Sequence, residues 1–243
     1  MLERLDYVKI APRRVLDAGS GPARDARALA RRYRKAEVLA VDFSRAMLHA
    51  GRPRLRFFQR RPPKPVCADL LRLPFAPATI GLLWSNMALH WVADPLAAMR
   101  EFHRVLAPEG LLMFSTLGPD TLAELRSAAG AARVHAFADM HDLGDMLVAA
   151  GFAEPVMDME RVTLQYDDGE ALLADLRASG QTNALSGRAR GLAGRRFRAS
   201  LTQKLTAQRS AGKFSVSYEV VYGHAWKAAP KRSADGVSVI KIY

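Results

Sequence analysis

Short apolar runs and amphipathic stretches alternate along the first half of the chain. Apolar runs at 15–18, 37–42, 79–86 and 111–116 predict buried parallel strands, because strands covered on both faces need no polar alternation. Apolar residues recur at helical spacing in 22–33 and 95–106, and Ser44 is suited to begin another helix that runs to about residue 50. This alternation of strand and helix predicts an α/β fold with a doubly wound, mostly parallel sheet.

The second half of the chain keeps the alternation less regularly. Helices are predicted at 120–131, 139–150 and 168–178, and a basic helix at 197–209. Weak alternation at 155–166 predicts a strand, and β-branched and aromatic residues at 215–226 predict the last one. A strand is also expected at 55–58, a proline-rich loop at 60–65, and a turn at 108–110.

The first apolar run leads into a glycine-containing turn, VLDAGSGPARD at 15–25. Its D-x-G-x-G pattern is formed by Asp17, Ala18, Gly19, Ser20 and Gly21. Glycines let the backbone bend sharply and let a ligand approach it without meeting a Cβ. A dinucleotide fingerprint would need glycine at position 24, and a P-loop would need G-K-[ST] after the loop; both are missing. A ligand other than a dinucleotide or a nucleoside triphosphate is therefore expected at this turn.

Two further acids follow the next strand-like runs. Asp42 ends the second run about 20 residues beyond the glycines, where a carboxylate can accept both hydroxyls of a ribose. Asp69 and Leu70 follow another short apolar stretch. This order of glycine turn and acids resembles the class I S-adenosylmethionine-dependent methyltransferases. The resemblance implies a Rossmann-like, seven-stranded sheet with an antiparallel last strand.

The same resemblance implies S-adenosylmethionine as the cofactor and S-adenosylhomocysteine as the product. The acids and the glycine turn would bind it, together with Phe43, Asn86 and Trp91. Asn86 stands at the carboxyl end of a predicted central strand, where open α/β sheets bind ligands. Trp91 can contact the sulfonium by a cation–π interaction. Another nucleoside ligand for a doubly wound domain is the alternative.

The second half resembles a particular group of these enzymes, the malonyl-acyl-carrier-protein O-methyltransferases of biotin synthesis. STLGPDTLAELR at 115–126 and YGHAWK at 222–227 are the most distinguishing blocks. The resemblance implies methylation of the free carboxylate of malonyl on acyl carrier protein, the partner. Arg126 and Arg177 are candidates to anchor that carboxylate, since arginine holds a carboxylate in a defined plane. His90 is a candidate to bond the substrate, with a capping role as the alternative.

The resemblance also suggests a division of the chain. We expect a cofactor-binding core at 1–167, a helical insertion over the substrate site at 168–212, a last strand at 213–230 and a tail at 231–243. The chain starts about one helix late for this group, so a lid over the cofactor is expected to be missing and turnover to be impaired. Three residues depart from the usual pattern: Ala23, Gly81 and Glu109.

The net charge of +12 indicates an acidic partner. Acyl carrier protein would dock on the basic helix through Arg195, Arg196, Arg198 and Lys204. The basic runs lack the interleaved aromatic residues that stack on bases, so nucleic acid is not expected. Two alternatives stay open: a methyltransferase acting on RNA or a small carboxylic acid, and a non-catalytic, cofactor-binding assembly factor.

Composition and residue spacing argue against membrane-spanning, secreted and metal-binding proteins. No run of about 20 apolar residues is present, and no signal peptide is visible, so no membrane association is expected. Cys67 is the one cysteine, which fits a reducing, cytoplasmic location; it is expected to be buried. No Cys/His spacing is typical of a metal site, so no metal is predicted.

Overall fold

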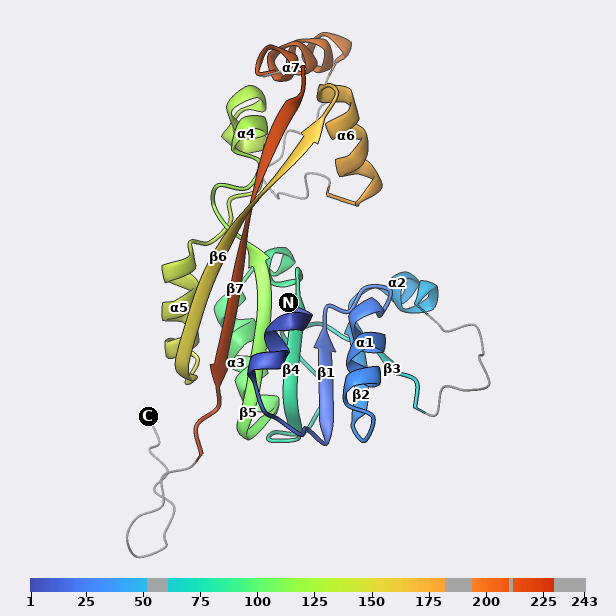
Figure 1. The fold of residues 1–243 in the computed structure, drawn as a ribbon, viewed down its shortest axis with the longest axis vertical. Coiled ribbons are helices and arrows are strands. Elements are labelled where there is room, and N and C mark those ends of the chain that lie inside the picture. Colours follow the sequence, from blue (N-terminus) through green and yellow to red (C-terminus); the bar gives the residue numbers. More distant parts are fainter. Residues whose placement is uncertain (52–60, 182–193, 210–211, 230–243) are drawn as a thin grey trace, which may run out of the picture. The chain divides into compact units, whose positions relative to one another are not determined.

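A seven-stranded sheet in the order β3-β2-β1-β4-β5-β7-β6 forms the framework of the computed structural model. The model describes residues 1–51, 61–181, 194–209 and 212–229 (Figure 1). The first five strands in this order run parallel, and β7 runs antiparallel between β5 and β6. The predicted α/β fold with an antiparallel last strand is therefore confirmed.

The parallel part of the sheet brings the carboxyl ends of its strands to one edge. β1 (Arg14–Ala18) pairs with β2 (Glu37–Asp42) on one side and with β4 (Ile80–Asn86) on the other. β4 also pairs with β5 (Leu106–Leu117). The strand order reverses between β1 and β4, and open α/β sheets bind their ligands beside such a point.

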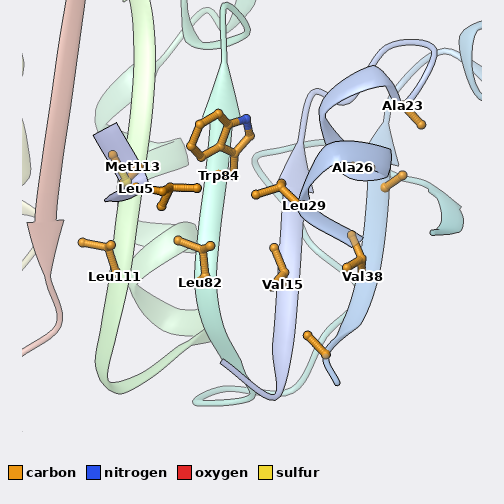
Figure 2. Packing of buried hydrophobic residues seen from close by; sticks show 12 residues of the cluster. Leu5, Val15, Ala23, Ala26, Leu29, Val38, Leu82, Trp84, Leu111 and Met113 are labelled. Atoms are coloured by element: carbon orange, nitrogen blue, oxygen red, sulfur yellow. The ribbon is translucent and has the colours of Figure 1, made fainter. Parts of the chain in front are cut away.

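The short η1 (Leu2–Tyr7) precedes β1, whereas α1 (Arg24–Arg32) follows β1 and α2 (Arg45–Ala50) follows β2. The short η2 (Leu89–Trp91) and α3 (Pro95–Val105) come after β4. The Ser44 hydroxyl accepts a hydrogen bond from the Met47 N–H at 3.3 Å, which confirms Ser44 as the predicted N-cap of α2. Figure 2 shows the buried cluster around Trp84 between α1, η1 and the central strands.

The chain divides into two compact units. The first comprises 1–116, 140–158 and 221–243 and includes α5 (Met140–Ala149). The second comprises 117–139 and 159–220, with α4 (Ala123–Ala129), η3 (Ala131–Arg133), α6 (Gly169–Ala178) and α7 (Arg195–Ala207). β6 (Ala153–Tyr166) and β7 (Phe214–Trp226) contribute residues to both.

The second unit has a hydrophobic core of its own. Leu125, Leu172, Leu205 and Phe214 belong to one buried cluster, so α4, α6, α7 and β7 pack around shared apolar side chains. The predicted insertion at 168–212 falls within this unit as far as the structure describes it.

Two predictions about the edge of the sheet were wrong. β3 occupies Lys64–Cys67, part of which was predicted to be loop. Pro65 is tolerated there because β3 is an edge strand, in which a missing N–H breaks no ladder on the open side. Cys67 ends this strand and is exposed, so its predicted burial was also wrong. The predicted strand at 55–58 lies outside the described residues.

The positions that depart from the family pattern have visible consequences. Ala23 and Glu109 both adopt a left-handed backbone, with φ of 54° and 61°. Such a φ is unfavourable for residues with a Cβ. The turn predicted at 108–110 was wrong, because these residues belong to the first part of β5. There the Glu109 N–H donates to the carbonyl of Lys227, the residue after β7, at 2.8 Å. A Cβ at Gly81 would lie 3.1 Å from Pro12 Cβ, so an acid there would crowd the entry to β1.

Candidate active site

The glycine turn folds back onto β2. The N–H groups of Gly19 and Ser20 both donate to the Val41 carbonyl, at 2.9 and 2.8 Å. Gly19 has a φ of +77°, and a Cβ there would lie 2.2 Å from Ala88 Cβ, so this position requires glycine. At Gly21 the φ is +50° and no described atom lies within 4 Å of the position a Cβ would take. The turn therefore presents bare backbone on its outer side.

Asp42 lies beside this turn at the end of β2. Its Oδ2 accepts from the Gly21 N–H and its Oδ1 from the Ser44 N–H, each at 2.7 Å. A carboxylate oxygen can accept more than one hydrogen bond. Both oxygens of this half-buried group can thus still receive hydroxyl donors such as those of a ribose.

Asp17 is buried beneath the turn, with 1% of its surface exposed. Among the described residues its Oδ2 has no hydrogen-bond partner, and neither has the buried Ser20 hydroxyl. Burial, together with the nearby carboxylates of Asp25 and Asp42, raises the pKa of Asp17 to about 8. Buried polar atoms that lack partners indicate a place for a polar or cationic ligand group.

A cleft of about 580 Å³ opens beside these residues. Large apolar side chains stand exposed at it: Phe43 is 80% exposed, Trp91 51% and Met47 49%. The lining combines the glycine turn, the end of β2, the segment after β4 and the turn at Asp69. It is formed by Gly19, Gly21, Asp42, Phe43, Ser44, Met47, Asp69, Leu70, Leu71, Met87, Ala88, Trp91, Val92 and Ala93.

The structure thus brings together most of the residues predicted to bind the cofactor. Asp69 joins them through a turn in which its Oδ1 accepts from the Leu71 N–H at 2.9 Å. Four residues predicted to bind the cofactor are not among the lining residues in the described part of the chain: Asp17, Ala18, Ser20 and Asn86. The Asn86 side chain bonds to Asp25 and Ser115 instead. The lining residues that the sequence analysis missed are Ser44, Met47, Leu71, Met87, Ala88, Val92 and Ala93.

His90 and Trp91 lie on η2, directly after the lining residues Met87 and Ala88. Their ring centroids are 5.3 Å apart at an angle of 43°. Trp91 lines the cleft and His90 is half-buried. Roles for the two rings toward substrate or sulfonium stay predictions.

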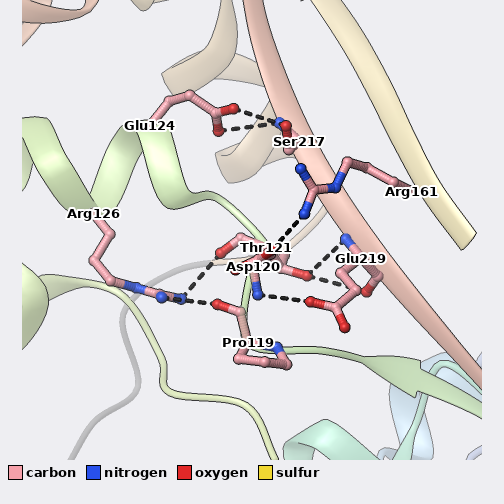
Figure 3. Close-up of polar contacts among 8 residues, drawn as sticks. All are labelled: Pro119, Asp120, Thr121, Glu124, Arg126, Arg161, Ser217 and Glu219. Carbon is pink, nitrogen blue, oxygen red and sulfur yellow. Dashed lines mark hydrogen bonds and ion pairs between the residues drawn. The ribbon is translucent and has the colours of Figure 1, made fainter. Parts of the chain in front are cut away.

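The two candidate arginines belong to the second unit. Figure 3 shows the Arg126 guanidinium donating to the carbonyls of Pro119 and Thr121, at 2.8 and 3.1 Å. Arg126 therefore holds the segment that precedes its own helix. Arg177 is exposed on α6, and its Nε donates to the Leu173 carbonyl at 3.0 Å.

Comparison with known proteins agrees with this geometry. Residues 16–114 match a family described as a methyltransferase domain. Two solved structures share the fold. The YcgJ protein from Bacillus subtilis has a TM-score of 0.69 at 17% identity, covering 94% of this chain and 97% of that one. The phosphoethanolamine N-methyltransferase 2 of Haemonchus contortus, in complex with S-adenosyl-L-methionine, has a TM-score of 0.59 at 16% identity, covering 94% and 51%.

Fold, cleft and family match define an S-adenosylmethionine-dependent methyltransferase, and S-adenosylmethionine is its cofactor. The bare turn at Gly21 and the buried carboxyl of Asp17 fit this ligand, which carries an ammonium group and a ribose. A curated protein from Gallionella capsiferriformans, named malonyl-[acyl-carrier protein] O-methyltransferase, is 49% identical over 99% of this chain and 86% of its own length. The chain belongs to the malonyl-[acyl-carrier protein] O-methyltransferase family.

No helix in the described residues is long and apolar enough to cross a lipid bilayer.

Proposed function

We propose that this protein methylates the free carboxylate of malonyl carried on acyl carrier protein, giving the methyl ester that leads toward biotin. The observation that carries the proposal is the 49% identity along 99% of the chain to a relative with that named activity. An exposed Cys67 and no second cysteine support a reducing compartment, the cytoplasm, for the reaction.

The proposed reaction requires little acid or base catalysis from the protein. Bound S-adenosylmethionine supplies a methyl group already activated on a sulfonium. A malonyl carboxylate is ionised at neutral pH, so no general base is needed. The side chains must bind the two reactants, orient them and exclude water. In this proposal the cleft residues hold the cofactor, Trp91 borders the sulfonium, and His90 bonds the acceptor.

Arg126 is the preferred anchor for the malonyl carboxylate. Two backbone carbonyls fix its guanidinium, and a guanidinium carries more N–H donors than these two bonds use. A donor group held in place in advance loses less freedom when it binds an anion. Arg177 remains the second candidate, with an exposed side chain that loses more freedom on binding.

Acyl carrier protein, an acidic partner, would dock on α7. Arg195, Arg196, Arg198 and Lys204 are all exposed there, and the helix itself has no acidic residue. Arg198 makes an ion pair with Glu170, which also accepts from the Thr202 hydroxyl at 2.9 Å. The docking charge should therefore come mainly from Arg195, Arg196 and Lys204.

The proposal is tested by methyl transfer to purified malonyl-acyl carrier protein, followed by mass spectrometry of the carrier. A mass gain of one methyl group is expected. Acetyl-acyl carrier protein is the matched control, because it lacks the carboxylate and should gain nothing. Transfer to both carriers, transfer to RNA alone, or cofactor binding with no transfer would each overturn the proposal.

Arg126→Lys tests the anchor. Lysine keeps the positive charge but cannot offer a planar pair of donors. We expect unchanged affinity for S-adenosylhomocysteine and a loss of transfer of about tenfold or more, the size of one charge-assisted hydrogen bond. Normal transfer by this variant would remove Arg126 from the substrate site.

A further inference from the structure

Asp25, in the first turn of α1, is a half-buried carboxylate that the cofactor cleft does not use directly. Its Oδ2 accepts the Asn86 amide N–H at 2.8 Å and the Trp84 indole N–H at 3.0 Å. Both donors lie on β4, more than fifty residues along the chain. A carboxylate is favoured at this position by the helix N-terminus.

The hydrogen bonds continue beyond Asn86. Its Oδ1 accepts from the Ser115 hydroxyl at 2.5 Å. The hydroxyl and the carbonyl of Ser115 in turn both accept from the Met87 N–H, at 3.1 and 3.0 Å. Ser115 is 1% exposed, so this part of the network is shielded from water, where hydrogen bonds fix geometry most firmly.

The network ends at a strained piece of the cleft wall. Met87 adopts a left-handed backbone with a φ of +56°, which is unfavourable for a residue with a side chain. The next residue, Ala88, has its Cβ 2.2 Å from where a Cβ on Gly19 would stand. Met87, Ala88 and Gly19 all line the cofactor cleft. A conformation of this kind persists only where its surroundings hold it.

We propose that Asp25 is a positioning residue for cofactor binding, acting through Asn86 and Ser115 to hold the Met87–Ala88 wall against the glycine turn. Asp25 and Asn86 thus act on the cofactor from outside the lining of the cleft. The inference rests on the cofactor site alone and is independent of the methyl acceptor. The competing view is that Asp25 only pairs the buried Trp84 indole and so stabilises the core.

Affinity for S-adenosylhomocysteine, measured by calorimetry on the full chain without any acceptor, distinguishes the two views. Asp25→Ala should weaken binding by about tenfold or more, the size of one charge-assisted hydrogen bond. Asp25→Asn keeps an acceptor oxygen and should recover most of that affinity. Trp84→Phe removes only the other donor to Asp25, and should lower the unfolding temperature without changing the affinity.

Two further measurements keep the test independent of global stability. The losses of affinity caused by Asp25→Ala and by Asn86→Ala should not be additive in the double variant, because both substitutions break the same network. Labelled methionine methyl groups should show a shifted Met87 signal in the folded, cofactor-free Asp25→Ala protein. Wild-type affinity in a folded Asp25→Ala protein, or full additivity of the two variants, would overturn the proposal.

Discussion

Asp17 keeps a carboxyl group where water hardly reaches it. Burial is the largest cause of its raised pKa, followed by the negative charge of Asp25, and that of Asp42 adds less. A hydrogen bond from the Ala26 N–H acts in the opposite direction. In the cofactor-free protein this carboxyl is therefore largely protonated at neutral pH, and a cationic ligand group would favour its ionised form.

The raised pKa of Asp17 predicts a specific pH dependence of stability. Its pKa rises from 3.8 to about 8 on folding, so in this window the folded protein holds a proton that the unfolded chain has lost. The contribution of Asp17 to the free energy of unfolding should therefore fall as the pH rises from about 4, and level off above about 8. Asp17→Asn should lack this component.

Urea unfolding of cofactor-free wild type and Asp17→Asn at several pH values within that window measures the difference. Titration of the other groups is common to both proteins and cancels. The variant should gain stability relative to wild type as the pH rises. Parallel curves for the two proteins would show that Asp17 titrates normally in the folded state.

The sequence showed the acids and glycines of the cleft because each stands at the end of a strand-like run. It gave no sign of Asp25, whose partners are distant in sequence and adjacent only after β4 has paired with β1. An acid in the first turn of a helix is too common a feature to indicate such a role. Asn86 was predicted to contact the cofactor because it ends a central strand. In the structure its side-chain amide is hydrogen-bonded to Asp25 and Ser115.

At the scale of elements, the segment between β5 and α4 is bound to β7 (Figure 3). The Gly118 N–H donates to the Glu219 carbonyl at 2.9 Å, and the Asp120 N–H donates to the Glu219 carboxylate at 2.8 Å. A Cβ at Gly118 would lie 2.5 Å from Glu219 Cδ. The segment at 118–121, which lies within one of the two distinguishing sequence blocks, is thus hydrogen-bonded to β7 at Glu219.

Thr121 is the centre of this junction and offers a clean test of it. Its buried hydroxyl accepts from the Glu219 N–H and donates to the Glu219 carbonyl, both at 3.1 Å. Thr121→Val keeps the shape but leaves a buried N–H unpaired, so it should lower the free energy of unfolding by about 1–3 kcal/mol. Thr121→Ser keeps the hydroxyl, so its free energy of unfolding should fall much less. Urea unfolding of both variants and of wild type measures the difference. Equal losses in the two variants would contradict a hydrogen-bonding role.

Periodicity predicted most elements, and it failed where tertiary contacts decide the ends. α4 begins at Ala123 rather than near 120, because the Leu122 N–H bonds to the Ser217 carbonyl on β7 and Leu122 takes a left-handed φ of 56°. β5 begins at Leu106, opposite Ile80, before an irregular register. β3 carries too little apolar pattern to be recognised, since an edge strand is partly exposed.

At the scale of the whole molecule, the excess positive charge is distributed over both units. Exposed arginines such as Arg31 and Arg34 lie in the first, and those of α7 in the second. A net charge of +12 raises the encounter rate with any acidic partner, but only a local cluster can select one face. The proposed docking therefore requires that α7 contribute more than its share of the charge.

Matched charge reversals separate the effect of net charge from the effect of the local basic cluster on α7. Arg195→Glu with Arg196→Glu should weaken binding of acyl carrier protein about tenfold or more at low salt, mainly through slower association. Arg31→Glu with Arg34→Glu changes the net charge equally at exposed positions of the first unit, and should have a much smaller effect. Raising the ionic strength toward about 1 M shortens the screening length to about 3 Å. The affinities of wild type and the two variants for acyl carrier protein should then become similar. If both reversals weaken binding equally, the carrier protein responds to net charge and α7 is not its docking site.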